Sequence, residues 1–200
     1  VEDCYGMFSY ARRANPKVIV DIGANFGMFS KLCSMLFPDA DIYSYEPHPE
    51  AFTWLKQNAR GTKLRIHPVA VGGESGIVKF YTKCDSTNSC VKDDGDFTVE
   101  CVAGSLVADG RQIDFLKMDC EGSEWMILKD PALLRRAKEF CLAYHLRGRP
   151  VEELKRMVEA SGHLVVECFS TKGEGQYGLM RSVLDAESAR KATARKAGAD

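Results

Sequence analysis

The chain has 200 residues, a length that suits one domain with a sizeable core. Its formal net charge of -1 argues against a nucleic-acid-binding protein, which usually carries a basic excess, and no apolar run approaches the roughly 20 residues of a membrane span. The sequence shows no basic-then-apolar signal pattern, and several of its eight cysteines lie in apolar runs typical of buried thiols. We therefore expect a cytoplasmic protein with one domain over residues 1–185 and a polar tail over 186–200.

The predicted elements alternate between buried strands and amphipathic helices. Continuous apolar runs indicate strands buried on both faces, and apolar residues at helical spacing indicate helices. In chain order we expect a helix over 1–15, strand 17–23, helix 26–37, strand 41–47, helix 49–60, strand 63–71, antiparallel strands 75–83 and 97–104, strand 113–119, a mostly helical 123–137 that could break at Pro131, strand 140–146, helix 150–162, and strands 163–170 and 177–185. This order predicts an α/β fold, with a mostly parallel sheet and helices on both faces.

The stretch VIVDIGANFGMFS contains a glycine turn between the first, central strand and the next helix. Glycines at such a turn let the backbone approach a ligand, and the helix offers its N-terminal N–H groups. The turn lacks the middle glycine of the dinucleotide pattern G-x-G-x-x-G. Asp21, just before it, would repel a pyrophosphate but suits the ammonium group of S-adenosylmethionine. We expect Asp21, Gly23, Ala24, Asn25 and Gly27 to bind this cofactor.

The second predicted strand ends in an acid, Glu46. An acid at that place can accept hydrogen bonds from both hydroxyls of a ribose. Both NAD and S-adenosylmethionine carry such a ribose, so Glu46 indicates a nucleoside without choosing between them. Pro47 and His48 follow, where His48 could cover the ribose or the adenine. With Val71 at the end of the third strand, these residues complete the expected cofactor site.

The stretch KMDCEGSEW places four charges directly after a buried strand. Buried charge is costly unless it is paired, so these side chains need a role. We expect Asp119 and Glu121 to lie in the crevice near the transferred methyl group; the alternative is an ion pair of Asp119 with Lys117. Glu124 is either a site residue or a helix residue favoured by the dipole.

His145 ends the fifth strand of the parallel part and should lie beside Asp119. A neutral histidine can accept a proton near pH 7, so His145 is the expected base and Asp119 the other candidate. Asp119, Glu121 and His145 could form an oxygen-rich metal site, but sequence spacing alone does not establish one, and we expect no metal. Arg147 and Arg149 either bind an anionic substrate or are solvated in a loop.

Four segments together carry a family resemblance. In chain order they read VIVDIGANFGMFS, YSYEPHPEAFTWLKQN, HPVAVGGESG and IDFLKMDCEGSEWMIL. Over most of the chain the sequence resembles the FkbM-type methyltransferases. The resemblance implies a Rossmann-like class I fold and S-adenosylmethionine-dependent methylation of a hydroxyl oxygen on a sugar, glycolipid or polyketide. The family often has an acid two residues before the histidine; this chain has Ala143, which leaves the role of His145 open.

Two alternative functions remain at this point. The first is a nicotinamide-dependent oxidoreductase on a Rossmann fold, against which the missing glycine and the missing Tyr-x-x-x-Lys pair argue. The second is a module that binds S-adenosylmethionine without catalysis, against which the charged DCEGSE cluster argues. The expected partner is a small hydroxylated molecule, with no nucleic acid and no membrane.

Overall fold

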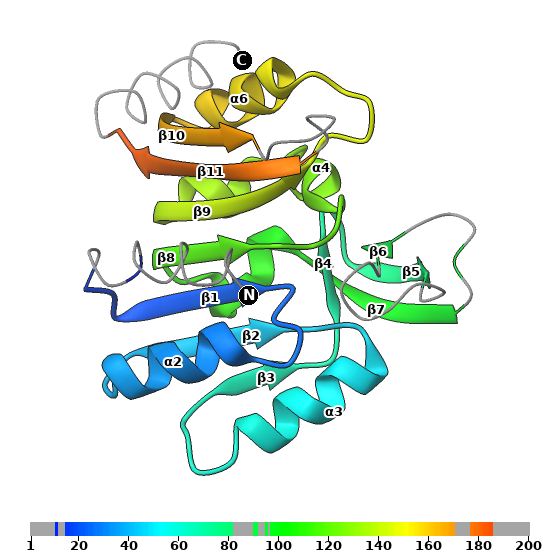
Figure 1. Ribbon diagram of the computed structural model, residues 1–200, viewed down its shortest axis with the longest axis vertical. Helices are drawn as coiled ribbons and strands as arrows, with labels where there is room; N and C mark the ends of the chain where they lie inside the picture. The colour runs from blue at the N-terminus through cyan, green and yellow to red at the C-terminus, as the bar shows by residue number, and fades with distance from the viewer. Residues whose placement is uncertain are drawn as a thin grey trace.

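The main sheet of the chain has seven strands, shown in a computed structural model in Figure 1. The structure describes residues 11, 15–81, 95, 97–170 and 177–185, and residues 90–91 by their backbone. The strands of the main sheet are β1 (Val18–Ile22), β2 (Asp41–Tyr45), β3 (Arg65–His67), β8 (Ile113–Met118), β9 (Ala137–His145), β10 (His163–Ser170) and β11 (Tyr177–Leu184). Their order is β10-β11-β9-β8-β1-β2-β3, parallel from β9 to β3, with β11 antiparallel to both β9 and β10.

Helices cover both faces of this sheet, as the buried strand runs predict. The helical segments are α2 (Met28–Leu36), α3 (Pro49–Asn58), η1 (Gly104–Gly110), α4 (Glu124–Ile127), α5 (Ala132–Arg135) and α6 (Val151–Ala160). On one face, Ile19 of β1 and Phe115 of β8 share a buried core with Phe29 of α2. On the other face, Val20 shares a core with Leu154 of α6. Successive residues of β1 therefore point into two separate cores, and both are withdrawn from water.

A second sheet of four strands lies beside the main one, at the right of Figure 1. Its strands are β4 (Ala70–Gly72), β5 (Gly76–Tyr81), β6 (Cys90–Val91) and β7 (Phe97–Ala103), in the order β4-β7-β5-β6. The predicted antiparallel pairing of residues 75–83 with 97–104 is confirmed by β5 and β7. The single strand predicted over 63–71 is wrong: it divides into β3 and β4 around Pro68, which has no N–H to donate to a ladder.

The predicted break at Pro131 in the mostly helical segment 123–137 is confirmed, because the segment forms two short helices, α4 and α5. The Asp130 carboxylate accepts the N–H of Ala132 at 2.9 Å at the start of α5. The segment η1 was not predicted, and it contains Ala108 and Asp109 with positive φ of 54° and 55°. The helix expected over 1–15 lies outside the described residues except for positions 11 and 15, and the tail over 186–200 lies wholly outside them.

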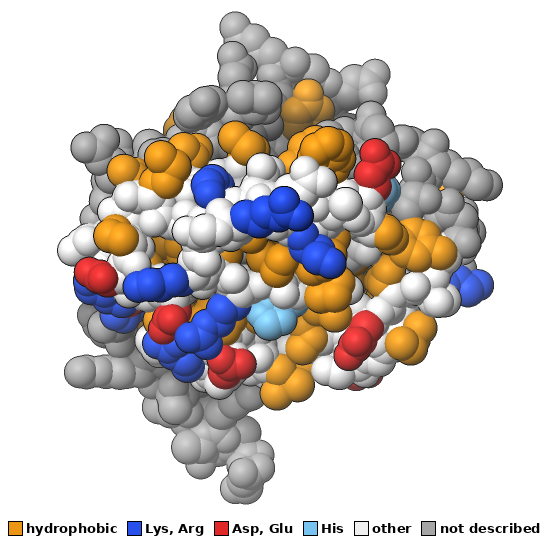
Figure 2. All heavy atoms as spheres, turned by 90° about the horizontal axis from the view of Figure 1, so that it is seen from below, with side chains coloured by type: hydrophobic (Ala, Val, Ile, Leu, Met, Phe, Trp, Pro, Cys, Tyr) orange, Lys and Arg blue, Asp and Glu red, His pale blue; other side chains and the backbone are white. Residues whose placement is uncertain are grey.

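Charges of both signs lie on the end of the molecule near α3. Figure 2 views this end and shows basic and acidic side chains with apolar side chains between them. Among the ion pairs of β2 and β3, the Asp41 carboxylate bonds Arg65 at 3.0 Å and Arg111 at 2.7 Å. None of the helices within the described part of the chain combines the length and the apolar character needed to cross a membrane.

Candidate active site

The connections of the main sheet change direction at β1. The chain runs from β1 to β2 and β3 on one side, whereas β8 and β9 lie on the other side of β1. Ligands of open parallel sheets bind outside the carboxyl ends of the strands at such a switch point. The predicted site residues follow β1, β2, β8 and β9, so the topology brings them to one edge of the sheet.

The turn after β1 is tied to the end of β2. The N–H groups of Gly23 and Ala24 both donate to the Tyr45 carbonyl at 3.0 Å, and Gly27 N–H donates to the Ala24 carbonyl at 2.8 Å. Gly23 has a φ of 73°, and a Cβ on it would lie 1.8 Å from the Asp119 carbonyl oxygen. Close packing against the loop after β8 therefore requires a glycine here. The expected approach of a ligand to Gly23 stays a prediction.

Glu46 closes the cofactor side of the crevice. Its Oε2 accepts the N–H of Asn25 at 2.7 Å, and its Oε1 accepts the N–H of His48 at 2.7 Å. Burial raises the pKa of Glu46 to about 7, although these two hydrogen bonds oppose the shift. Each oxygen keeps lone-pair capacity for a further donor, such as a ribose hydroxyl. The Asn25 Oδ1 is buried without a partner among the described residues. A nucleoside with several donors fits this arrangement.

Asp21 lies below the turn rather than in the open crevice. Its side chain is 0% exposed, its Oδ1 lies 2.9 Å from Lys117 Nζ, and its Oδ2 accepts the Ser30 hydroxyl at 2.6 Å. Lys117 also donates to the Gly23 carbonyl at 2.6 Å. The ion pair of this lysine is therefore with Asp21, and its role is to hold β8 to the end of β1. Contact between Asp21 and an ammonium group stays a prediction.

The remaining cofactor-side residues are well anchored. His48 Nδ1 accepts the Ala51 N–H at 3.3 Å and so caps the start of α3, while its ring meets the edge of Phe80 at 6.4 Å. Pro47 is half-buried next to it. Val71 is buried in β4, within the larger of the two main cores. The capping role fixes the His48 ring, and its contact with a cofactor stays a prediction.

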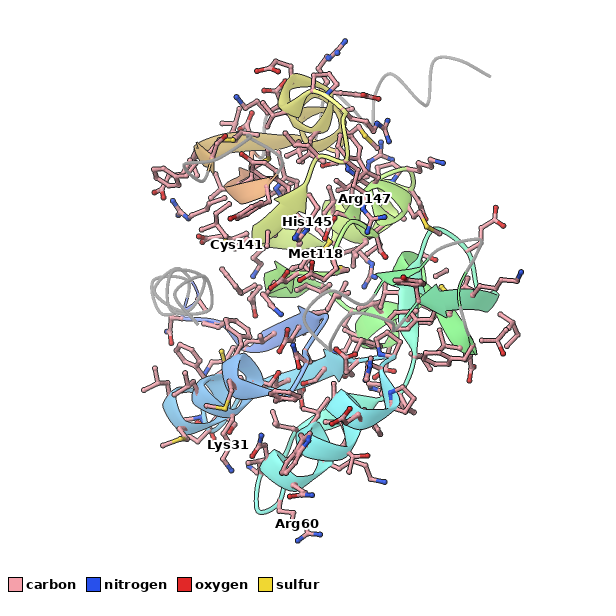
Figure 3. All side chains as sticks on the ribbon, turned by 45° about the vertical axis from the view of Figure 1, so that its right-hand side comes forward. Lys31, Arg60, Met118, Cys141, His145 and Arg147 are labelled. Carbon is pink, nitrogen blue, oxygen red and sulfur yellow. The ribbon has the colours of Figure 1, made fainter. Side chains whose placement is uncertain are left out.

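His145 and three acidic side chains meet at the ends of β8 and β9. The Nε2 atom of His145 lies 3.2 Å from Glu121 Oε2, and Nδ1 lies 3.3 Å from Glu124 Oε1. Ligand atoms of Asp119, Glu121 and His145 all lie within 4.8 Å of one another. Figure 3 shows His145 and Arg147 near Met118 at the end of β8. The expected proximity of His145 and Asp119 is confirmed.

Electrostatics in this cluster oppose ionisation of the acids. Burial raises the pKa of Glu121 to about 7, opposed by His145 and reinforced by Asp119 and Glu124. Burial also raises the pKa of Asp119, although Lys117 and His145 lower it. For His145, burial lowers the pKa, but the hydrogen bond and charge of Glu124 with the other two acids outweigh it, so the pKa is raised. The cluster therefore has more negative groups than positive partners.

Two supporting residues were missed or left open by sequence reasoning. Glu124 is 0% exposed, and its Oε1 accepts the N–H groups of Cys120 and Gly122 at 3.0 and 3.1 Å besides facing the histidine. Trp125 Nε1 donates to the His145 carbonyl at 2.8 Å. An acid at the first turn of the apolar helix EWMI was the only sequence signal for Glu124, and no signal pointed to Trp125.

The two arginines near the crevice differ in their contacts. Arg147 is exposed and donates to the Glu121 carbonyl. Arg149 pairs with Glu153 and lies with its guanidinium 3.9 Å from the centre of the Trp125 ring. The guanidinium of Arg149 is thus committed to structure, whereas that of Arg147 stands at the rim of the crevice.

The sheet order, the glycine turn after β1 and the acid after β2 define a Rossmann-like fold of the methyltransferase class. Residues 21–156 match the model of the methyltransferase FkbM domain, and the chain belongs to this family. The family match implies S-adenosylmethionine as the cofactor.

Known proteins resemble this chain in sequence or in fold. It is 24% identical over 151 residues to hexuronic acid methyltransferase AglP of Haloferax volcanii, covering 72% of this chain and 62% of that protein. It is 32% identical over 72 residues to 31-O-demethyl-FK506 methyltransferase FkbM of Streptomyces tacrolimicus, covering 35% of this chain and 28% of that protein. Its fold resembles the precorrin-6y C5,15-methyltransferase of Geobacter metallireducens, with a TM-score of 0.56, 18% identity and coverage of 92% and 87% of the two chains. The chain thus spans less than two thirds of the curated relatives.

Proposed function

We propose that this chain transfers the methyl group of S-adenosylmethionine to a hydroxyl oxygen of a small molecule of the sugar, glycolipid or polyketide kind. The observation that carries the proposal is the position of Glu46 and of the His145 cluster at one edge of the sheet. The first is suited to hold a nucleoside and the second to take a proton. A nicotinamide oxidoreductase is less favoured, because the chain belongs to a methyltransferase family.

The residues on the cofactor side bind and orient S-adenosylmethionine. The bound cofactor supplies an electrophilic methyl group on sulfur. Glu46 accepts hydrogen bonds from the ribose hydroxyls, because the N–H groups of Asn25 and His48 hold its two oxygens in place. The turn over Gly23 to Gly27 supports the rest of the cofactor. Orientation of this kind can lower the barrier by several kcal/mol, because a bimolecular reaction becomes effectively unimolecular.

The residues of the acceptor side handle the proton of the hydroxyl group. With Nδ1 protonated, His145 donates to Glu124 and presents the lone pair of Nε2. Nε2 accepts the hydroxyl proton as the oxygen attacks the methyl carbon. Glu121 and Asp119 stabilise the resulting imidazolium by their charge. A general base of this kind typically contributes roughly 10²–10⁴-fold to the rate.

The acceptor class follows from the same proposal. One relative is named for hexuronic acid and the other for 31-O-demethyl-FK506, a name that places the methyl group on oxygen. We propose a hydroxylated small molecule rather than a nucleic acid. A cytoplasmic location and a single domain over 1–185 remain predictions that accompany this proposal.

Turnover with a panel of acceptors tests the function. The chain is incubated with S-adenosylmethionine and a uronic acid, a glycolipid, a macrolide polyketide or RNA, and S-adenosylhomocysteine and methylated product are measured by mass spectrometry. We expect O-methylation of a hydroxylated small molecule. Methylation of RNA alone, or binding of NAD without S-adenosylmethionine in calorimetry, would overturn the proposal. Cofactor binding without turnover on any acceptor would indicate a non-catalytic module.

The role of His145 has its own test. His145→Gln keeps a hydrogen-bonding side chain but removes the base, so turnover should fall by roughly 10²–10⁴-fold with nearly unchanged cofactor affinity. Glu159→Gln, an exposed change on α6, is the control and should leave turnover as it is. A loss of cofactor affinity alone would make His145 structural. Unchanged turnover in His145→Gln with loss of turnover in Asp119→Asn would move the base to Asp119.

A further inference from the structure

We propose that Asp119, Glu121 and His145 bind a divalent metal ion, with Mn²⁺ or Mg²⁺ as the best match, in the crevice beside the acceptor. Each residue offers one ligand atom, and the three atoms lie within 4.8 Å of one another. Side chains from two neighbouring strand ends thus converge on one point. The binding of the ion is independent of the proposed methyl transfer, and only its role in the reaction rests on that function.

The charge of the cluster favours a cation. Three carboxylates, those of Asp119, Glu121 and Glu124, surround one imidazole. Lys117 forms its ion pair with Asp21 at 2.9 Å, and its charge also acts on Asp119. The guanidinium of Arg147 bonds the Glu121 backbone carbonyl. Burial opposes ionisation of Glu121 and Asp119, so a cation among these groups would stabilise their ionised forms.

Two acidic side chains of the cluster have carboxyl oxygens without a hydrogen-bond partner among the described residues. The Asp119 side chain makes no hydrogen bond or ion pair with any other described residue, although one of its oxygens points to within 4.8 Å of the other two ligand atoms. In Glu124, which is 0% exposed, Oε2 is buried without a hydrogen-bond partner in the described part of the chain. Buried polar atoms are nearly always satisfied, so unpartnered carboxylate oxygens beside a ligand set indicate a missing positive group.

The surroundings of His145 suit a metal ligand. A metal-bound histidine usually donates its other ring N–H to a carboxylate, which fixes the tautomer and strengthens the ligand. Here Glu124 Oε1 lies 3.3 Å from Nδ1 and is itself held by the N–H groups of Cys120 and Gly122. The ring is thereby set so that Nε2 faces Glu121 at 3.2 Å. Glu124 is a positioning residue in this arrangement.

The ligand types limit the choice of metal. Two carboxylates and one imidazole, with the remaining positions open to water or substrate, suit Mg²⁺ and Mn²⁺, and the imidazole favours Mn²⁺. No cysteine belongs to the ligand set, which disfavours a thiolate-bound zinc site. The open positions could take the acceptor hydroxyl, since a bound metal lowers the pKa of a coordinated O–H group.

Metal and proton compete for the same lone pair of His145. With an ion bound, Nε2 would be one of its ligands, and the proton of the acceptor hydroxyl would pass to water rather than to His145. Without the ion, Nε2 would accept that proton itself. The ion also offsets the three carboxylates, which would otherwise repel an acidic acceptor such as a uronate.

Direct binding of Mn²⁺ tests the site without cofactor or acceptor. The full chain is treated with a chelator, dialysed and titrated with Mn²⁺, and free ion is measured by electron paramagnetic resonance. We expect one ion per chain, with affinity at least about tenfold weaker in both Glu121→Gln and Asp119→Asn. Glu159→Gln removes the same charge from the exposed face of α6 and should bind as wild type does. Thermal unfolding checks that each variant is folded.

Three outcomes would overturn the proposed metal site or its role in the reaction. Absence of Mn²⁺ binding by the wild-type chain at millimolar concentration would overturn the site. Equal Mn²⁺ affinity in the wild type and in the three variants would also overturn the site, because the ion would then bind elsewhere. Turnover that is unchanged by the chelator would overturn the role of the ion in the reaction. Mn²⁺ binding with no methyl transfer under any condition would instead refute the proposed function and leave the site standing.

Discussion

Cofactor affinity should depend on pH through Glu46. This side chain is 6% exposed, and burial raises the pKa of its carboxyl group to about 7 despite the hydrogen bonds from Asn25 and His48. The ionised carboxylate accepts hydrogen bonds from ribose hydroxyls, whereas a protonated carboxyl group is a poorer acceptor. Binding should therefore favour the ionised form, release a proton near neutral pH, and strengthen as the pH rises.

The magnitude follows from the titration of one group. With a pKa of about 7, Glu46 is about one tenth ionised near pH 6 and about nine tenths ionised near pH 8. If only the ionised form holds the ribose well, the Kd for S-adenosylhomocysteine should be about tenfold weaker near pH 6 than near pH 8. Glu46→Gln keeps the size of the side chain without a titrating group, so its Kd should be weak and flat across this range.

Isothermal titration calorimetry near pH 6, 7 and 8 measures this effect in both proteins. Calorimetry in buffers of different ionisation enthalpy also counts the proton released on binding. A wild-type Kd that does not change over this range would refute the reasoning. The same slope in wild type and Glu46→Gln would refute it as well, because the titrating group would then be another residue.

Glu46 should also make the free energy of unfolding depend on pH. Its pKa is raised in the folded chain from an ordinary value of 4.5, so folding favours the protonated form. The stabilising contribution of Glu46 is therefore fully present below about pH 4.5 and is lost as the pH rises through about 7. Relative to Glu46→Gln, the free energy of unfolding of the cofactor-free wild type should fall by up to about 3 kcal/mol over this range, measured by urea titration.

Two further changes test the packing below the crevice. Gly23→Ala should lower the melting temperature far more than Gly61→Ala, since both glycines have positive φ but only the first would place a Cβ against a backbone atom, 1.8 Å from the Asp119 oxygen; similar losses would contradict this account. Lys117→Met should cost about 3–5 kcal/mol of unfolding free energy in urea, because it leaves Asp21 buried without its ion pair; a loss below about 1 kcal/mol would contradict a stabilising role of this ion pair.

The strands, and the edge of the sheet at which the candidate site lies, could be predicted because short stretches of sequence indicate both. Runs such as VIVDI and IDFLKM are apolar without alternation, which is typical of strands covered on both faces. Polar residues that follow such strands must then gather at the carboxyl edge of the sheet. This reasoning predicts that Glu46, Asp119 and His145 lie at one edge of the sheet.

The contacts that could not be predicted from the sequence are those between residues on different strands of the sheet. Asp21 and Lys117 are paired positions in the register of β1 and β8, and register between parallel strands far apart in the chain is not encoded by either strand alone. The role of Glu124 was also hidden in the sequence, because it depends on how close this side chain lies to His145 at the end of β9. The place of β4 in the second sheet was missed, because Pro68 divides a run that otherwise resembles a single strand.

The contact of Gly23 with the Asp119 carbonyl has a consequence for how two ligands influence each other. Asp119 N–H also donates to the Ile22 carbonyl at 3.0 Å, so the loop after β8 is attached directly to the turn after β1. A displacement of one loop should therefore disturb the other. We expect the binding of cofactor and acceptor to be coupled, and thermodynamic linkage requires that each ligand changes the affinity of the other by the same factor.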